Sequence, residues 1–89
     1  MLNFKELINE EPVFRLYHAL VGTLAMKNEM PIKVVRVDKN KKATFIFITK
    51  KAESVKTCKA VVSAIDAPFF TSWIAGDFPE VDFERIEIA

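Results

Sequence analysis

Two neighbouring segments rich in β-branched and aromatic residues place the tightest limit on how this chain folds. Residues 32–38 are IKVVRVD and residues 43–49 are ATFIFIT, with a short polar stretch between them. Such a pair predicts a β-hairpin. Because successive side chains of a strand point to opposite faces, both strands present apolar side chains on each face. The pattern therefore predicts a hairpin at the centre of a sheet that is covered on both sides.

Helical patterns precede this hairpin. Residues 3–10 begin with Asn3 as a capping residue and carry a short apolar stripe. Pro12 disfavours helix in the residue before it, so a second helix is expected at residues 12–28, with Asn28 at its end. This second helix is apolar over most of its surface, which predicts that it is buried on most sides or packs against another chain.

The segments after the hairpin predict two more helices and a strand. Residues 52–66 carry apolar side chains at helical spacing. Pro68 opens a short helical turn that ends at Gly76. Residues 81–88 alternate like a strand, except that the apolar positions change parity, which predicts a bulge near Glu84.

These elements predict an α+β fold in the order α-α-β-β-α-(short α)-β. The sheet is expected to have three strands, formed by the hairpin at residues 32–49 and the C-terminal strand, with mostly antiparallel pairing. The length of 89 residues predicts a single domain, residues 1–89.

The composition of the chain indicates the environment in which it folds. Cys58 is the only cysteine, so no intrachain disulfide is possible, which favours a reducing, cytoplasmic environment. Hydrophobic residues make up 51% of the chain, a generous supply for a small core, and some are expected either to stay on the surface or to meet a partner chain. The longest apolar-rich run, residues 13–26, is too short to span a bilayer.

Charge is distributed unevenly. Residues 30–62 hold nine Lys and Arg against two acidic residues, giving +7, whereas residues 63–89 hold one Arg against six acidic residues, giving −5. The two blocks either pair inside the fold or form separate binding patches.

Few residues are suited to catalysis, so we expect no enzymatic activity, no cofactor and no metal site. His18 is the only histidine, with no nucleophile or orienting carboxylate readable beside it. Cys58 lies on the apolar stripe of its expected helix, which predicts an inert thiol. The C-terminal acids do not match a calcium-loop pattern, and two glycines cannot form a glycine-rich phosphate loop.

Binding is the favoured class of function. Four aromatic residues lie within ten positions and predict a protein-interaction surface, or alternatively a cap on one end of the core: Phe69, Phe70, Trp73 and Phe78. Self-association is expected through the hairpin sheet or through the helix at residues 12–28, on which three residues are candidates: Phe14, Tyr17 and Val21.

These features predict a small non-catalytic regulator or inhibitor that docks on a larger complex. Short chains of this kind, with Lys-rich usage typical of an A+T-rich genome, are common among phage and mobile-element accessory genes. The alternative is a nucleic-acid-binding protein that contacts phosphates through lysines of the hairpin and the following helix, unless those lysines are simply solvated: Lys39, Lys41, Lys42, Lys50 and Lys51. An enzyme using His18 or Cys58 is the least favoured of the three.

Overall fold

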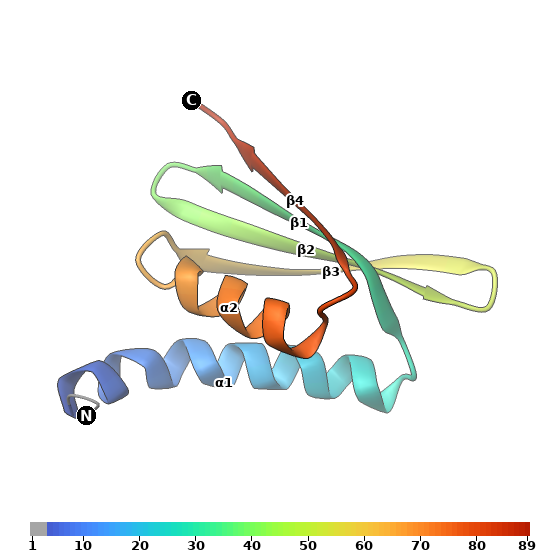
Figure 1. The fold of residues 1–89 in the computed structure, drawn as a ribbon, viewed down its shortest axis with the longest axis horizontal. Helices are drawn as coiled ribbons and strands as arrows, with labels where there is room; N and C mark the ends of the chain where they lie inside the picture. The colour runs from blue at the N-terminus through green and yellow to red at the C-terminus, as the bar shows by residue number, and fades with distance from the viewer. Residues whose placement is uncertain (1–3) are drawn as a thin grey trace.

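A computed structural model describes residues 4–89, and the surroundings of side chains from residue 12 onward. The elements follow in the order α1 (Phe4–Met26), β1 (Met30–Lys39), β2 (Lys42–Lys51), β3 (Ser54–Ser63), α2 (Ala67–Asp77) and β4 (Asp82–Glu87). The predicted α+β class is confirmed. Figure 1 shows α2 crossing the sheet and α1 running beside α2 along its length.

The first helix is continuous, so the predicted break before Pro12 is wrong. Pro12 lies inside α1, which runs from Phe4 to Met26. Proline lacks the N–H that would bond the carbonyl of Ile8, yet the helix continues through this position. The predicted end is confirmed: Asn28 has a φ of 55°, and the backbone N–H of Glu29 returns to the carbonyl of Leu24 at 2.9 Å.

The segment after the hairpin is a third strand, so the predicted helix at residues 52–66 is wrong. Its apolar positions fit a helical stripe, but the side chains that turn inward alternate with period two: Cys58, Ala60 and Val62. The residues of β3 pair antiparallel with the whole of β2. Without that partner, the N–H and C=O groups along one side of the central strand β2 would have no strand to bond.

The sheet has four strands in the order β3-β2-β1-β4, rather than the predicted three. The pairs β1–β2 and β2–β3 are antiparallel, whereas β4 lies parallel to β1, so the sheet is mixed. The predicted bulge near Glu84 is wrong, because β4 pairs in regular register with β1 from Asp82 to Glu87. The irregularity lies instead in β1, between Pro31 and Lys33.

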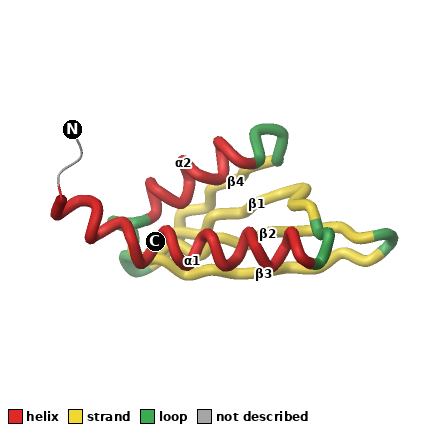
Figure 2. The backbone as a smooth tube through the Cα atoms, turned by 90° about the horizontal axis from the view of Figure 1, so that it is seen from below, coloured by secondary structure: helices red, strands yellow, loops and turns green. Residues whose placement is uncertain are grey.

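Both helices contribute to one core against one face of the sheet. Each strand that contributes to the core supplies only side chains that point to one face of the sheet. Among these side chains are Val34, Phe45, Phe47 and Val62. Figure 2, seen from below, shows α1 and α2 as neighbouring rods along the sheet, with the tip of the β2–β3 hairpin reaching beyond them. The predicted cover on both faces is therefore wrong.

The uncovered face is called here the open face. Its apolar members are Val35, Val37, Ile46, Ile48, Val61 and Ile86. The four on the central strands are only half-buried, and Val61 and Ile86 are 55% and 41% exposed. The two-sided apolar pattern of the hairpin thus corresponds to one covered face and one face open to solvent.

The order of the strands also pairs part of the two charge blocks. Because acidic β4 lies beside β1, Lys33 approaches Asp82 at 3.8 Å and Glu84 at 3.9 Å. Arg85 of the acidic block binds Asp38 of the basic block at 2.7 Å, which pairs a residue of the opposite sign from each block. Lys56 of β3 reaches Glu29, a residue outside both blocks, at 3.7 Å. Among the ion pairs described, Lys33 is therefore the residue through which the basic block is partly offset by the acidic block.

Candidate interaction surfaces

Three surface features bring together residues that are distant in sequence: an aromatic seam between the helices, a charged groove near the β1–β2 turn, and the open face. Among residues 4–89, no helix is long and apolar enough to cross a membrane. Within the same part of the chain, no group of three or more His, Cys, Asp or Glu side chains is placed to hold a metal ion.

The aromatic seam joins residues predicted for two separate purposes. Trp73 of α2 meets Phe14 of α1 edge-on, with 5.4 Å between ring centroids, and stacks with Phe69 at 6.2 Å. Phe14 also stacks with His18 at 5.8 Å. Phe14 is 48% exposed, while Phe69 and Trp73 are half-buried, so the edges of these rings reach the surface.

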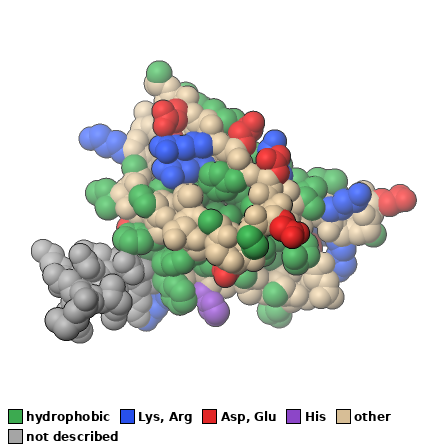
Figure 3. All heavy atoms as spheres, in the orientation of Figure 1, with side chains coloured by type: hydrophobic (Ala, Val, Ile, Leu, Met, Phe, Trp, Pro, Cys, Tyr) green, Lys and Arg blue, Asp and Glu red, His purple; other side chains and the backbone are tan. Residues whose placement is uncertain are grey.

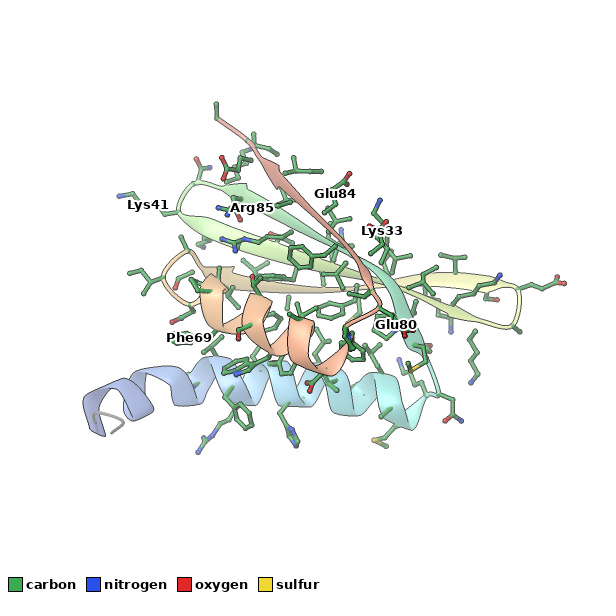
Figure 4. All side chains as sticks on the ribbon, in the orientation of Figure 1. Lys33, Lys41, Phe69, Glu80, Glu84 and Arg85 are labelled. Carbon is green, nitrogen blue, oxygen red and sulfur yellow. The ribbon has the colours of Figure 1, made fainter. Side chains whose placement is uncertain are left out.

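The figures show where the seam lies. Phe69 is labelled in Figure 4 at the start of α2, where that helix approaches α1. Figure 3 shows hydrophobic side chains, together with the single histidine, along the edge of the molecule that α1 forms. The seam is therefore a band of partly exposed aromatic rings between two helices.

Two residues predicted as surface contacts are core residues. Phe70 is 0% exposed and packs against Tyr17, Phe45 and Phe47, with centroid distances of 5.1, 4.8 and 6.5 Å. Tyr17 is buried as well, and its hydroxyl donates to Asp77 at 2.6 Å. Burial, the hydrogen bond to Asp77 and its negative charge all raise the pKa of Tyr17 far above the ordinary value.

Two other predicted residues lie apart from the seam rings. Val21 is half-buried against the core. Phe78 follows α2 at its far end and lines two apolar pockets of about 370 and 340 Å³, which it shares with Pro79 and Val81. Position along the helix separates Phe78 from Phe69, so the four predicted aromatics do not form one patch.

The charged groove lies between the start of α2, the β1–β2 turn and β4, and has a volume of about 860 Å³. Five cations line it, together with two carboxylates: Arg36, Lys39, Lys41, Lys42 and Arg85, with Asp38 and Glu87. Figure 3 shows basic and acidic side chains gathered above this part of the molecule, and Figure 4 places Arg85 near Lys41.

Asp38 organises the groove. Its carboxylate accepts hydrogen bonds from the Nε atoms of Arg36 at 2.7 Å and Arg85 at 2.8 Å. Arg36 is 8% exposed, and its Nη1 also donates to Thr71 of α2 at 3.2 Å. Burial opposes ionisation of Asp38, but the two guanidinium groups outweigh it and lower the pKa of Asp38 below its ordinary value.

The lysines predicted to contact phosphates fall into two groups. Lys39, Lys41 and Lys42 lie at the groove. In the antiparallel register of β1 and β2, Lys39 pairs with Lys42 at one end, and Met30 pairs with Lys50 at the other. Lys50 and Lys51 therefore lie at the far end of β2, about 25 Å away at roughly 3.3 Å per residue.

The remaining candidates for chemistry lie on different elements. His18 is exposed on α1, where its ring stacks on Phe14. Cys58 is half-buried on β3, rather than on a helix, and packs against the core. The sequence analysis did not single out Arg36 and Asp38 of the groove, although two charged residues inside an otherwise apolar strand were the available signal.

No protein-family model, curated protein or solved structure matches this chain. The functional argument therefore depends on the surfaces described above.

Proposed function

We propose that this chain is a non-catalytic protein-interaction domain of the phage or mobile-element accessory type, a small regulator or inhibitor that docks on a larger complex. The observation that carries the proposal is the aromatic seam. Trp73 lies between Phe14 and Phe69, and all three rings are partly exposed. Tryptophan and phenylalanine are enriched at the centres of protein interfaces, where burying a ring removes a large apolar area from water.

The seam is suited to binding because its rings are held in place before a partner arrives. The ring of Trp73 also contacts the ring of Tyr17, with 5.4 Å between their centroids. Tyr17 is itself held in the core by its hydrogen bond to Asp77. A ring that is already ordered loses little side-chain entropy on binding. The partner we propose is a protein that places apolar side chains against Phe14 and Phe69, on either side of Trp73. The single free cysteine supports placing this encounter in the cytoplasm.

Position-specific photocrosslinking in the cells that produce the chain tests this proposal. A photoreactive phenylalanine analogue at Phe14 is expected to crosslink one defined protein other than the chain itself. Ala19 supplies the matched control, because it is exposed on the same helix but lies about 140° around the axis from Phe14. Trp73→Ala should reduce the adduct formed at Phe14 without removing the folded domain.

Equal labelling from Phe14 and Ala19, or no adduct from Phe14 in a folded chain, would contradict docking at the seam. An adduct between two copies through Phe14 would instead place self-association on the helices.

The second candidate is nucleic-acid binding, and the charged groove is the observation that favours it. Lys39, Lys41 and Lys42 line the groove beside two arginines, although Asp38 and Glu87 offset part of that charge. Phosphate contacts of this kind make binding strongly salt-dependent. Replacing these three lysines with alanine should abolish a low-salt gel shift, whereas Lys50→Ala/Lys51→Ala should not. If the unmodified chain gives no shift at low salt, this candidate is wrong.

A further inference from the structure

We infer that a second copy of this chain binds the open face, with a two-fold axis parallel to the strands. This surface lies opposite the aromatic seam, so the inference goes beyond the docking function proposed above and does not depend on it. The helices cover only the other face of the sheet, and the half-buried apolar side chains of β1 and β2 face solvent. An apolar sheet face of this kind is buried when a second sheet packs against it, with about 10 Å between the two sheets.

The register of the sheet shows why a second copy fits. The central row across the four strands is Lys59, Ile46, Val35 and Glu84. A two-fold axis parallel to the strands reverses the order of each row between the copies. Lys59 of each copy then lies over Glu84 of the other, and Ile46 lies over Val35. The next row is Val61, Thr44, Val37 and Ile86, and it brings Val61 over Ile86 in the same way.

The other two-fold arrangement of stacked sheets has its axis across the strands, and it is disfavoured by charge. It would place Glu84 over Glu84 and Lys59 over Lys59, and like charges across an interface cost free energy. The charges therefore select one arrangement of the dimer. Figure 4 shows Glu84 and Lys33 on neighbouring strands at the acidic side of the face. In the central three rows, two lysines, Lys33 and Lys59, balance two acids, Asp82 and Glu84, so these rows carry no net charge that would repel a copy.

The size of the face meets what a dimer needs. β1, β2 and β3 have ten residues each and β4 has six. With strands about 4.8 Å apart and about 3.3 Å per residue, two stacked faces cover about 1,100 Å². Specific interfaces begin at about 1,000 Å², so the face is large enough for a weak, reversible dimer. At one end of the interface, Lys39 of each copy approaches Lys42 of the other. These long side chains can extend their ammonium groups into water.

Charge reversal with rescue tests the inference. Sedimentation equilibrium of the full chain over about 1–300 µM should show reversible dimerisation. Lys59→Glu and Glu84→Lys should each weaken the dimer at least about tenfold, because each sets like charges opposite one another at two symmetric positions. The double variant Lys59→Glu/Glu84→Lys should restore most of the affinity. Both residues lie exposed on edge strands, so the monomer is expected to fold.

Matched controls carry the same charge changes elsewhere: Lys27→Glu just after α1 and Glu80→Lys before β4, both exposed, should leave the dimer unchanged. Val61→Glu should abolish it, with circular dichroism confirming a folded sheet. A strictly monomeric chain at 300 µM, or a double variant as weak as the single ones, overturns the inference. Either result leaves docking at the seam intact, because the crosslinking from Phe14 reports on the opposite surface.

Discussion

At the residue scale, Asp38 joins two arginines from neighbouring strands. It accepts hydrogen bonds from two arginines, one of which, Arg36, is buried and also contacts α2 through Thr71. Arg36 lies over the ring of Phe45, with 5.7 Å from its guanidinium carbon to the centroid. A guanidinium in this place needs a nearby carboxylate, because an unpaired buried charge costs several kcal/mol.

Stability is expected to fall in acid because of Asp38. Its folded-state pKa is lowered, so between that pKa and the ordinary value of about 3.9 the unfolded chain binds more protons. The stabilisation is therefore present above pH 4 and is lost as the pH falls through the folded-state pKa. Asp38→Asn should lower the free energy of unfolding by about 1–3 kcal/mol at pH 7 and flatten this acid dependence. Urea titrations between pH 2.5 and 7 measure both effects.

Asp82→Asn is the control for that experiment, since the Asp82 side chain is 71% exposed and pairs only with Lys33 at 3.8 Å among the contacts described. Exposed ion pairs contribute about 0–1 kcal/mol. An acid dependence that is the same in the Asp38→Asn variant would contradict the assignment.

Phe70 and Phe69 are adjacent in sequence but differ in role. Phe70→Ala should cost about 3–5 kcal/mol, because it removes a fully buried ring with three aromatic neighbours. Phe69→Ala should cost less than about 1.5 kcal/mol, because this ring is only half-buried at the seam. Chemical denaturation of both variants measures the difference. Similar losses from the two would mean that Phe69 also belongs to the core.

At the element scale, the β1–β2 turn requires a positive φ at two residues, and only one of them is of a type that favours it. Asn40 and Lys41 have φ values of 53° and 62°, the conformation of a type I′ turn. Asparagine tolerates a positive φ, whereas lysine adopts it at a steric cost that is absent for glycine.

Lys41→Gly is therefore expected to raise the free energy of unfolding by about 0.5–1 kcal/mol, measured by thermal or urea denaturation. Lys39→Gly provides the contrast, because Lys39 lies in a strand and glycine there should destabilise the sheet. A loss of stability in the Lys41→Gly variant would show that the lysine side chain contributes more than its backbone conformation costs.

The helix expected at residues 52–66 shows why local spacing can mislead. Val55, Cys58 and Val62 fit a helical stripe, and the same segment also fits a strand whose inner positions are Cys58, Ala60 and Val62. Local propensity does not separate the two, because the segment is short and half polar. The segment forms a strand because the otherwise free edge of β2 gains a full ladder of hydrogen bonds when β3 pairs with it.

At the scale of the whole molecule, self-association through the open face predicts that stability depends on concentration. A ligand that binds only the folded state raises apparent stability by mass action, and here the ligand is a second copy. The midpoint of thermal unfolding should therefore rise between about 5 and 200 µM. The Lys59→Glu variant should show a smaller rise over the same range, because its dimer is weaker. An unmodified chain whose midpoint stays constant would contradict a reversible dimer.

The parallel strand β4 is the other feature that only the whole molecule explains. Residues 81–88 were predicted as a strand, but their partner was not readable from the sequence. Pairing with β1 sets Phe83 and Arg85 on the helix side and Glu84 and Ile86 on the open face. The change of parity, taken as a bulge, is thus explained by a regular strand with apolar groups on both faces.

The sequence alone determined the hairpin, the long apolar helix, the short aromatic helix and the α+β class, because strand and helix periodicities are local properties of the chain. Tertiary structure decided the identity of β3, the fourth strand and its parallel pairing, and the sorting of aromatic rings into Phe70 in the core and Phe69 and Trp73 at the surface. It also decided that Lys59 and Glu84 share one row of the open face. Such relations depend on which segments pair and which face the helices cover, and those are set by hydrogen bonding and burial between residues far apart in sequence.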